Sequence, residues 1–156
     1  MARWSEVEVE VPELAALARG FLDAFVHKTI ATLRRDGSPR ISGTEVTFAQ
    51  GDVWFGSMWR SVKALDLQRD PRFALHSGSQ SPPEWKGDAK LAGRVEEVTD
   101  PELIAAINGQ EASEERSHLF RGEITELVVV RLGDPADHIV IDTWREGRGE
   151  FRQERR

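Results

Sequence analysis

The chain has 156 residues, 39% of them hydrophobic and 31% charged, with a formal net charge of −6 and no cysteine. These values predict one soluble globular domain over 1–156 in the cytoplasm, and the acidic excess argues against a nucleic-acid partner. Without cysteine there is no disulfide or thiolate metal site, and no apolar run is long enough to span a membrane or to act as a secretory signal.

The N-terminal half of the sequence predicts a helix followed by a meander of strands. An amphipathic helix is expected over 12–27, because apolar residues recur at helical spacing and Pro12 suits a first turn. The pattern then changes to short strands over 28–35, 40–49 and 53–58. The turn sequences DGSP and QGD separate these strands, which predicts antiparallel pairing.

The second half alternates helices and strands. A short helix is predicted over 61–70, with Ser61 as its N-cap, and a second over 99–109, where Thr99 and Glu102 have capping-box spacing. An exposed helix is expected over 110–121, a loop over 79–88, and a polar, fraying tail from 147. The remaining strands are predicted over 72–79, 89–98, 123–132 and 138–146. The sum is a mainly β (α+β) chain of six or seven antiparallel strands, typical of a closed or half-closed barrel.

The strand-to-helix corner at 56–63, GSMWRSVK, concentrates cations and hydroxyls in a mildly acidic protein. Helix N-termini expose unpaired N–H groups and favour negative charge, so a phosphate can bind there. Arg60 could add a bidentate contact, Lys63 a point charge, and Ser57 and Ser61 hydroxyl donors. The alternative is a serine-capped helix with solvated cations. Spacing alone leaves both open, although cations oppose the dipole at a helix start.

The order DGSP, PRISGTEVTF, VWFGSM and MWRSVKALDLQRDPRFALH resembles the split-barrel flavin-binding superfamily, that is, the pyridoxamine 5′-phosphate oxidase-like proteins and their deazaflavin-using relatives. The signature S-x-K-x-x-x-L…D/N-P-R of that family is matched by Ser61, Lys63, Leu67, Asp70, Pro71 and Arg72. The resemblance covers about 25–100 well and the C-terminal third only by topology. It implies a six- to seven-stranded antiparallel split β-barrel with FMN as cofactor, or the deazaflavin coenzyme F-420 as the alternative.

The resemblance also implies roles for individual residues. Phosphate contacts are expected from the corner residues Ser57, Arg60, Ser61 and Lys63. The flavin ring edge is expected along the second strand at Ser42, Gly43 and Thr44, where the missing Cβ of glycine allows a close approach. Trp59 either shields the cofactor or packs beside the helix, and both interpretations stay open.

The family places its cofactor between two subunits, which implies a homodimer. Trp144, Arg145 and Arg148 are candidates to reach the site from the partner, against the simpler reading of a last strand and a solvated basic tail. The loop 79–88 with Trp85 is a candidate wall of the substrate pocket. His76 could face the ring, the core or the surface.

Two departures from the family pattern favour cofactor binding over pyridoxamine oxidation. Position 62 is Val where the oxidase has a cation, which Arg60 could replace, and TWREGRGEFRQERR lacks the oxidase's substrate-reading Arg and His pattern. No histidine pair has metal-ligand spacing, and no acid, base or nucleophile is identifiable. We expect an oxidoreductase acting on a small organic substrate, or a non-catalytic carrier of flavin, deazaflavin or haem.

Overall fold

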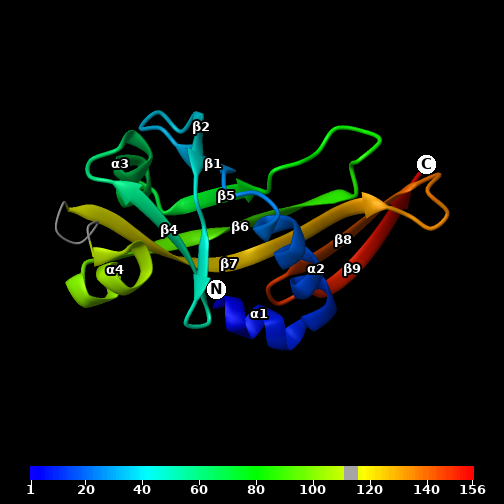
Figure 1. The fold of residues 1–156 in the computed structure, drawn as a ribbon, viewed down its shortest axis with the longest axis horizontal. Helices are drawn as coiled ribbons and strands as arrows, with labels where there is room; N and C mark the ends of the chain where they lie inside the picture. The colour runs from blue at the N-terminus through cyan, green and yellow to red at the C-terminus, as the bar shows by residue number, and fades with distance from the viewer. Residues whose placement is uncertain (111–115) are drawn as a thin grey trace.

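The computed structural model describes residues 1–110 and 116–156, and its centre is an antiparallel sheet with helices at its sides (Figure 1). Within the described residues the strands are β1 (Lys28–Leu33), β2 (Pro39–Thr44), β3 (Thr47–Ala49), β4 (Asp52–Met58), β5 (Arg72–His76), β6 (Gly87–Val98), β7 (Ser117–Leu132), β8 (Ile139–Arg145) and β9 (Gly149–Arg155). The helices are α1 (Trp4–Glu10), α2 (Pro12–Asp23), α3 (Val62–Arg69) and α4 (Pro101–Asn108).

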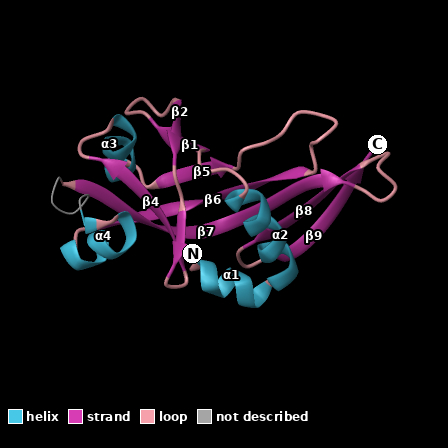
Figure 2. Ribbon diagram, in the orientation of Figure 1, coloured by secondary structure: helices cyan, strands magenta, loops and turns pink. Residues whose placement is uncertain are grey.

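The strand order is β2-β1-β5-β6-β7-β4-β3, and β8 joins β7 to β9. The long strands β6 and β7 run through the length of the molecule (Figure 2). β7 pairs with β4 over its first part, where Ser57 lies opposite His118, and with β8 over its second part. One strand therefore connects the corner after β4 to the C-terminal hairpin.

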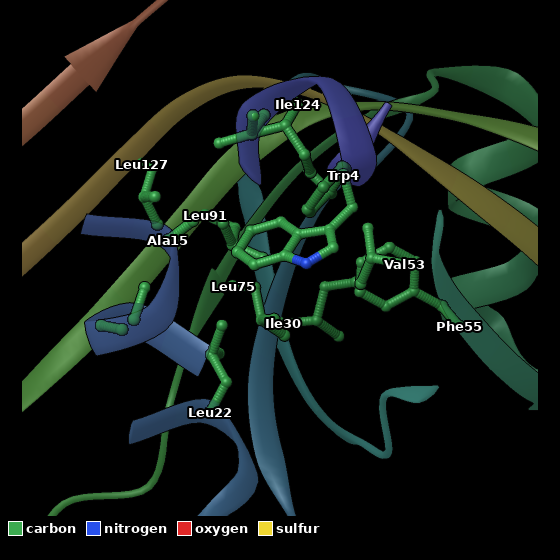
Figure 3. Close-up of a cluster of buried hydrophobic side chains, with 14 of the residues drawn as sticks. Trp4, Ala15, Leu22, Ile30, Val53, Phe55, Leu75, Leu91, Ile124 and Leu127 are labelled. Carbon is green, nitrogen blue, oxygen red and sulfur yellow. The ribbon is translucent and has the colours of Figure 1, made fainter. Parts of the chain in front are cut away.

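The main hydrophobic core lies between α1, α2 and the inner face of the sheet. Figure 3 shows the indole of Trp4 among Ile30, Val53, Leu91 and Ile124, and all of these side chains are almost completely buried. Arg3, the N-cap residue of α1, pairs with the buried carboxylate of Asp52 in β4 and so attaches the start of this helix, next to Trp4, to the sheet. The core thus fixes β4, which leads into the 56–63 corner.

The helices predicted over 12–27, 61–70 and 99–109 and most strands are confirmed, and four segments differ. One of them is α1, which the sequence analysis did not predict. The expected strand over 40–49 is two strands, β2 and β3, interrupted at Glu45 and Val46. The tail does not fray: it forms β9, because Gly147 and Gly149 have positive φ and allow a hairpin turn onto β8. The sheet therefore has nine strands in the described residues.

The helix expected over 110–121 is wrong for its second part, and 111–115 lie outside the described residues. Ser117–Arg121 belong to β7, because they pair with β4. Sequence pattern favoured a helix there, whereas pairing with a distant strand decides the conformation. None of the described helices has the length and apolar character that crossing a membrane requires.

Candidate functional site

A pocket of about 730 Å³ opens where the end of β4 and the start of α3 face β2, α4 and the start of β7. Six of the sequence-predicted site residues line it: Gly43, Thr44, Ser57, Trp59, Ser61 and Lys63. The tertiary structure thus brings together two segments, 42–44 and 57–63, that the family resemblance connected.

The hydroxyls of Ser57 and Ser61 lie 2.5 Å apart at the start of α3. Ser61 is the N-cap of the helix, and its oxygen also accepts the N–H of Ala64 at 3.3 Å. Two hydroxyl protons are present, and the contact between the serines uses one of them. The other is free to donate to a ligand in the pocket.

Lys63 is the cation of this pocket among the predicted phosphate ligands. Its Nζ donates to the carbonyl oxygen of Gly43 at 2.8 Å, so the side chain crosses from α3 to β2. Burial lowers the pKa of the Lys63 ammonium, and the nearby carboxylate of Glu45 opposes this shift. An anion in the pocket would relieve the cost of this buried charge.

Gly43 faces open space. A Cβ built on it would have no heavy atom within 4 Å beyond its chain neighbours, and its φ is not positive. Neither a turn nor a protein contact therefore requires glycine at this position. The missing side chain leaves the backbone at Gly43 accessible to a flat group.

Ser42 and Arg60 do not line the pocket. Ser42 lies opposite the buried Ile30 in the pairing of β2 with β1, so its side chain points to the core side of the sheet. The side chain of Arg60 is exposed, and the residue takes part in the corner through its backbone: its N–H donates to Nε2 of His118 at 3.0 Å.

Trp59 both lines the pocket and packs on the protein. Its ring stacks on His118 with centroids 4.8 Å apart and planes inclined by 8°, and the guanidinium of Arg116 lies 5.6 Å from its centroid. About half of the Trp59 surface is exposed (49%). Packing of Trp59 on the protein is therefore compatible with a role in shielding a cofactor, the two interpretations that the sequence left open.

The expectation that Trp144 reaches a partner subunit is corrected. Its side chain is 0% exposed and belongs to the main core cluster, so it cannot extend to another chain. Arg145 is held on the sheet by Glu126 at 2.5 Å, and Arg148 lies in the turn before β9. Alternation along β8 turns Trp144 to the core side and Arg145 to the other.

The loop 79–88 and His76 are also separate from this pocket. Trp85 and His76 are not among its lining residues, and Nε2 of His76 lies 3.4 Å from a carboxylate oxygen of Asp88. Gln80 and Lys86 instead line another cavity, of about 360 Å³, against α2. The described residues contain no group of three or more His, Asp or Glu side chains that could hold a metal.

The sequence reasoning missed the residues that line the pocket from α4, from the start of β7, from the segment around β3 and from the residue before β1: Ile107, Asn108, Arg116, Ser117, Glu45, Thr47 and His27. Gly56 and Met58 of the predicted corner also line it. Asn108 packs directly on Gly56, since a Cβ at Gly56 would lie 2.8 Å from its Oδ1. The glycine in VWFGSM was the one available signal that another element approaches this strand.

The structure is that of a mainly β protein with a pocket lined by two serine hydroxyls and one ammonium group at the start of a helix. The family model described as pyridoxamine 5′-phosphate oxidase matches residues 15–131, and the chain belongs to this family. The search of curated proteins gave no match.

Solved structures confirm the split-barrel fold. The conserved hypothetical protein Rv2991 from Mycobacterium tuberculosis is 21% identical, with a TM-score of 0.61 over 72% of this chain and 81% of that one. An F-420 reductase is 17% identical, with a TM-score of 0.54 over 70% and 94% of the two chains. A heme binding protein from Mycobacterium smegmatis is 15% identical, with a TM-score of 0.61 over 92% and 88%.

Proposed function

We propose that this protein is a flavin-binding oxidoreductase, with FMN as its cofactor or the deazaflavin F-420 in its place, acting on a small organic substrate. The observation that carries the proposal is the hydroxyl pair of Ser57 and Ser61, 2.5 Å apart, in one pocket with the ammonium of Lys63. Hydroxyl protons and an ammonium at a helix start form a donor set suited to a phosphate.

The residues present fit such a group. The Lys63 ammonium donates one N–H to the Gly43 carbonyl, and its other two N–H groups can donate to phosphate oxygens. Ser57 or Ser61 supplies the remaining hydroxyl proton, and the open backbone at Gly43 accommodates the ring. A bound flavin would supply the hydride or electron transfer, while these residues hold it, orient it and exclude water from one face.

The test is the absorbance spectrum of the purified protein, followed by titration of the cofactor-free protein with FMN and with F-420. We expect saturable binding of one of them, and reduction of the bound cofactor followed by reoxidation by a quinone or a nitroaromatic compound. Failure of both compounds to bind would overturn the proposal.

A non-catalytic carrier is the second candidate. The structural relative from M. smegmatis that covers 92% of this chain is named as a heme binding protein, and the exposed imidazole of His27 lines the pocket here. Saturable haem binding that His27→Ala abolishes would favour this candidate. Flavin or deazaflavin binding without turnover across several donors and acceptors would favour a flavin carrier.

We also propose a homodimer in which a second copy covers the outer face of the sheet. Ile30, Leu75 and Leu91 form a buried row across β1, β5 and β6, so the adjacent row points to the opposite face. That row consists of Ile41, Ala31, Ala74 and Ala92. Ile41 is 75% exposed, and the alanines make this face flat. Because β2 carries both Ile41 and Gly43, a second copy would lie beside the pocket.

A further inference from the structure

His118 lies directly under the corner that carries the proposed phosphate site. Its imidazole is 3% exposed, and in the antiparallel pairing of β4 with β7 it stands opposite Ser57. The ring stacks on Trp59 of the corner and on Phe120 of its own strand. These contacts fix the plane of the ring.

Both nitrogens of the His118 ring have partners. Nε2 accepts the backbone N–H of Arg60 at 3.0 Å, so this nitrogen carries no proton. Nδ1 lies 2.6 Å from Oε1 of Glu97 and therefore donates its proton to that carboxylate. The hydrogen bonds thus select one neutral tautomer of the ring.

The carboxylate of Glu97 is itself held from α3. Its Oε2 accepts the side-chain amide of Gln68 at 2.8 Å, while its Oε1 accepts from His118. A chain of hydrogen bonds therefore runs from α3 through β6 and β7 to the backbone of Arg60. It connects three elements to the residue immediately before the helix cap.

Arg60 needs such support. Its φ is +55°, in the left-handed region, which is strained for a residue that has a Cβ. The next residue is Ser61, whose N–H donates to the carbonyl of Met58 and whose hydroxyl contacts Ser57. The conformation of Arg60 consequently sets the direction of the Ser61 hydroxyl.

We propose that His118 is a positioning residue of the cofactor site, acting through Nε2 as the acceptor that holds Arg60 in the left-handed conformation. This inference rests on the proposed function, since it concerns the affinity for the cofactor phosphate. In this inference Arg60 contributes to the site through its backbone conformation. The residue that holds this conformation, His118, lies 58 positions later in the chain.

The test compares His118→Gln with His118→Asn. A glutamine amide oxygen reaches the former position of Nε2 and still accepts from Arg60, whereas an asparagine amide reaches only that of Nδ1. We expect the Arg60 amide proton to exchange with solvent about tenfold faster in His118→Asn than in the wild type, and within about threefold of it in His118→Gln. The Kd for FMN, or for F-420 if that binds, should rise by similar factors.

Glu97→Ala is a second variant in case His118→Asn does not fold. Without the carboxylate the proton is no longer held on Nδ1, so exchange at Arg60 should accelerate and the Kd should rise here too. Equal effects of glutamine and asparagine would overturn the inference, because they would show that only ring packing matters. If the wild type binds the cofactor and the Kd is unchanged in His118→Asn and Glu97→Ala, the inference about His118 is overturned and the proposed function stays intact. If the wild type binds neither FMN nor F-420, both the inference and the proposed function are overturned.

Discussion

Lys63 is the residue on which the charge of the proposed cofactor site depends. It is partly buried, lines the pocket and has no carboxylate within ion-pair distance among the residues that the structure describes. We expect Lys63→Ala to weaken binding of FMN or F-420 by about 1–3 kcal/mol, the range of a charge-assisted hydrogen bond. Isothermal titration measures this loss. Lys86→Ala, outside the pocket, is the matched control, and equal affinities in both variants would remove Lys63 from the site.

Gly43 allows the ring contact to be tested without disturbing the fold. Because an added Cβ meets nothing within 4 Å, Gly43→Ala and Gly43→Val should leave the melting temperature almost unchanged. If a ring lies on this backbone, both substitutions should weaken cofactor binding, and valine more than alanine, by about 1–3 kcal/mol for overpacking. A valine variant that binds like the wild type would show that the ring lies elsewhere.

At the scale of elements, Asp66 connects α3 to the sheet. Its buried carboxylate accepts hydrogen bonds from Thr32 in β1, from Arg40 in β2 at 2.7 Å and from Arg69 at 2.8 Å. Burial alone would raise the pKa of Asp66, but the bonds from Arg69, Arg40 and Thr32 outweigh it, and the net shift is downward. This carboxylate fixes the helix that carries Ser61 and Lys63.

Replacing Asp66 by Asn should destabilise the protein at neutral pH. Removing one partner of a buried ion pair costs roughly 3–5 kcal/mol, and we expect about 2–3 here because both arginines still reach water. The folded-state pKa lies below the unfolded value, so the carboxylate's contribution is present above about pH 4 and is lost as pH falls through the folded pKa.

Urea unfolding of Asp66→Asn and wild type at pH 7 and in acid measures this difference. The gap between their free energies of unfolding should narrow on acidification. Asp134→Asn removes an exposed carboxylate and is the control. Its free energy of unfolding should equal that of the wild type at both pH values. A gap that stays constant with pH would mean that the charge of Asp66 contributes nothing.

At the scale of the whole molecule, the proposed dimer depends on the flat outer face of β1, β5 and β6. Ala74→Lys would place a charge in this face, and Ala16→Lys places the same side chain on the exposed surface of α2. We expect a dimer for the wild type and Ala16→Lys, and a monomer for Ala74→Lys, because an unpaired charge is costly in an interface. Light scattering coupled to size exclusion distinguishes these outcomes. A monomeric wild type would overturn the dimer.

Local sequence signals predicted much of the fold. Turn residues, helical periodicity and the Pro-containing first turns located α2, α3, α4 and most strands within a few residues. The helix α1 was not predicted. The segment Ser117–Arg121 and the strand β9 were also missed. Both depend on a partner strand for their conformation, and a polar, charged stretch such as GEFRQER has no local preference strong enough to show it.

The amino-acid sequence alone determined the antiparallel β class and the capped helix after β4. It also determined that Ser57, Ser61 and Lys63 lie together at the start of that helix. These features depend on turns, caps and periodicity, which act over a few neighbouring positions. Only the tertiary structure decided which side chains reach the pocket: it excluded Ser42, Arg60 and Trp144 and added Asn108 and Ser117. Those outcomes follow from strand register and alternation between segments tens of residues apart, such as Ser57 opposite His118, and a local pattern does not encode such a register.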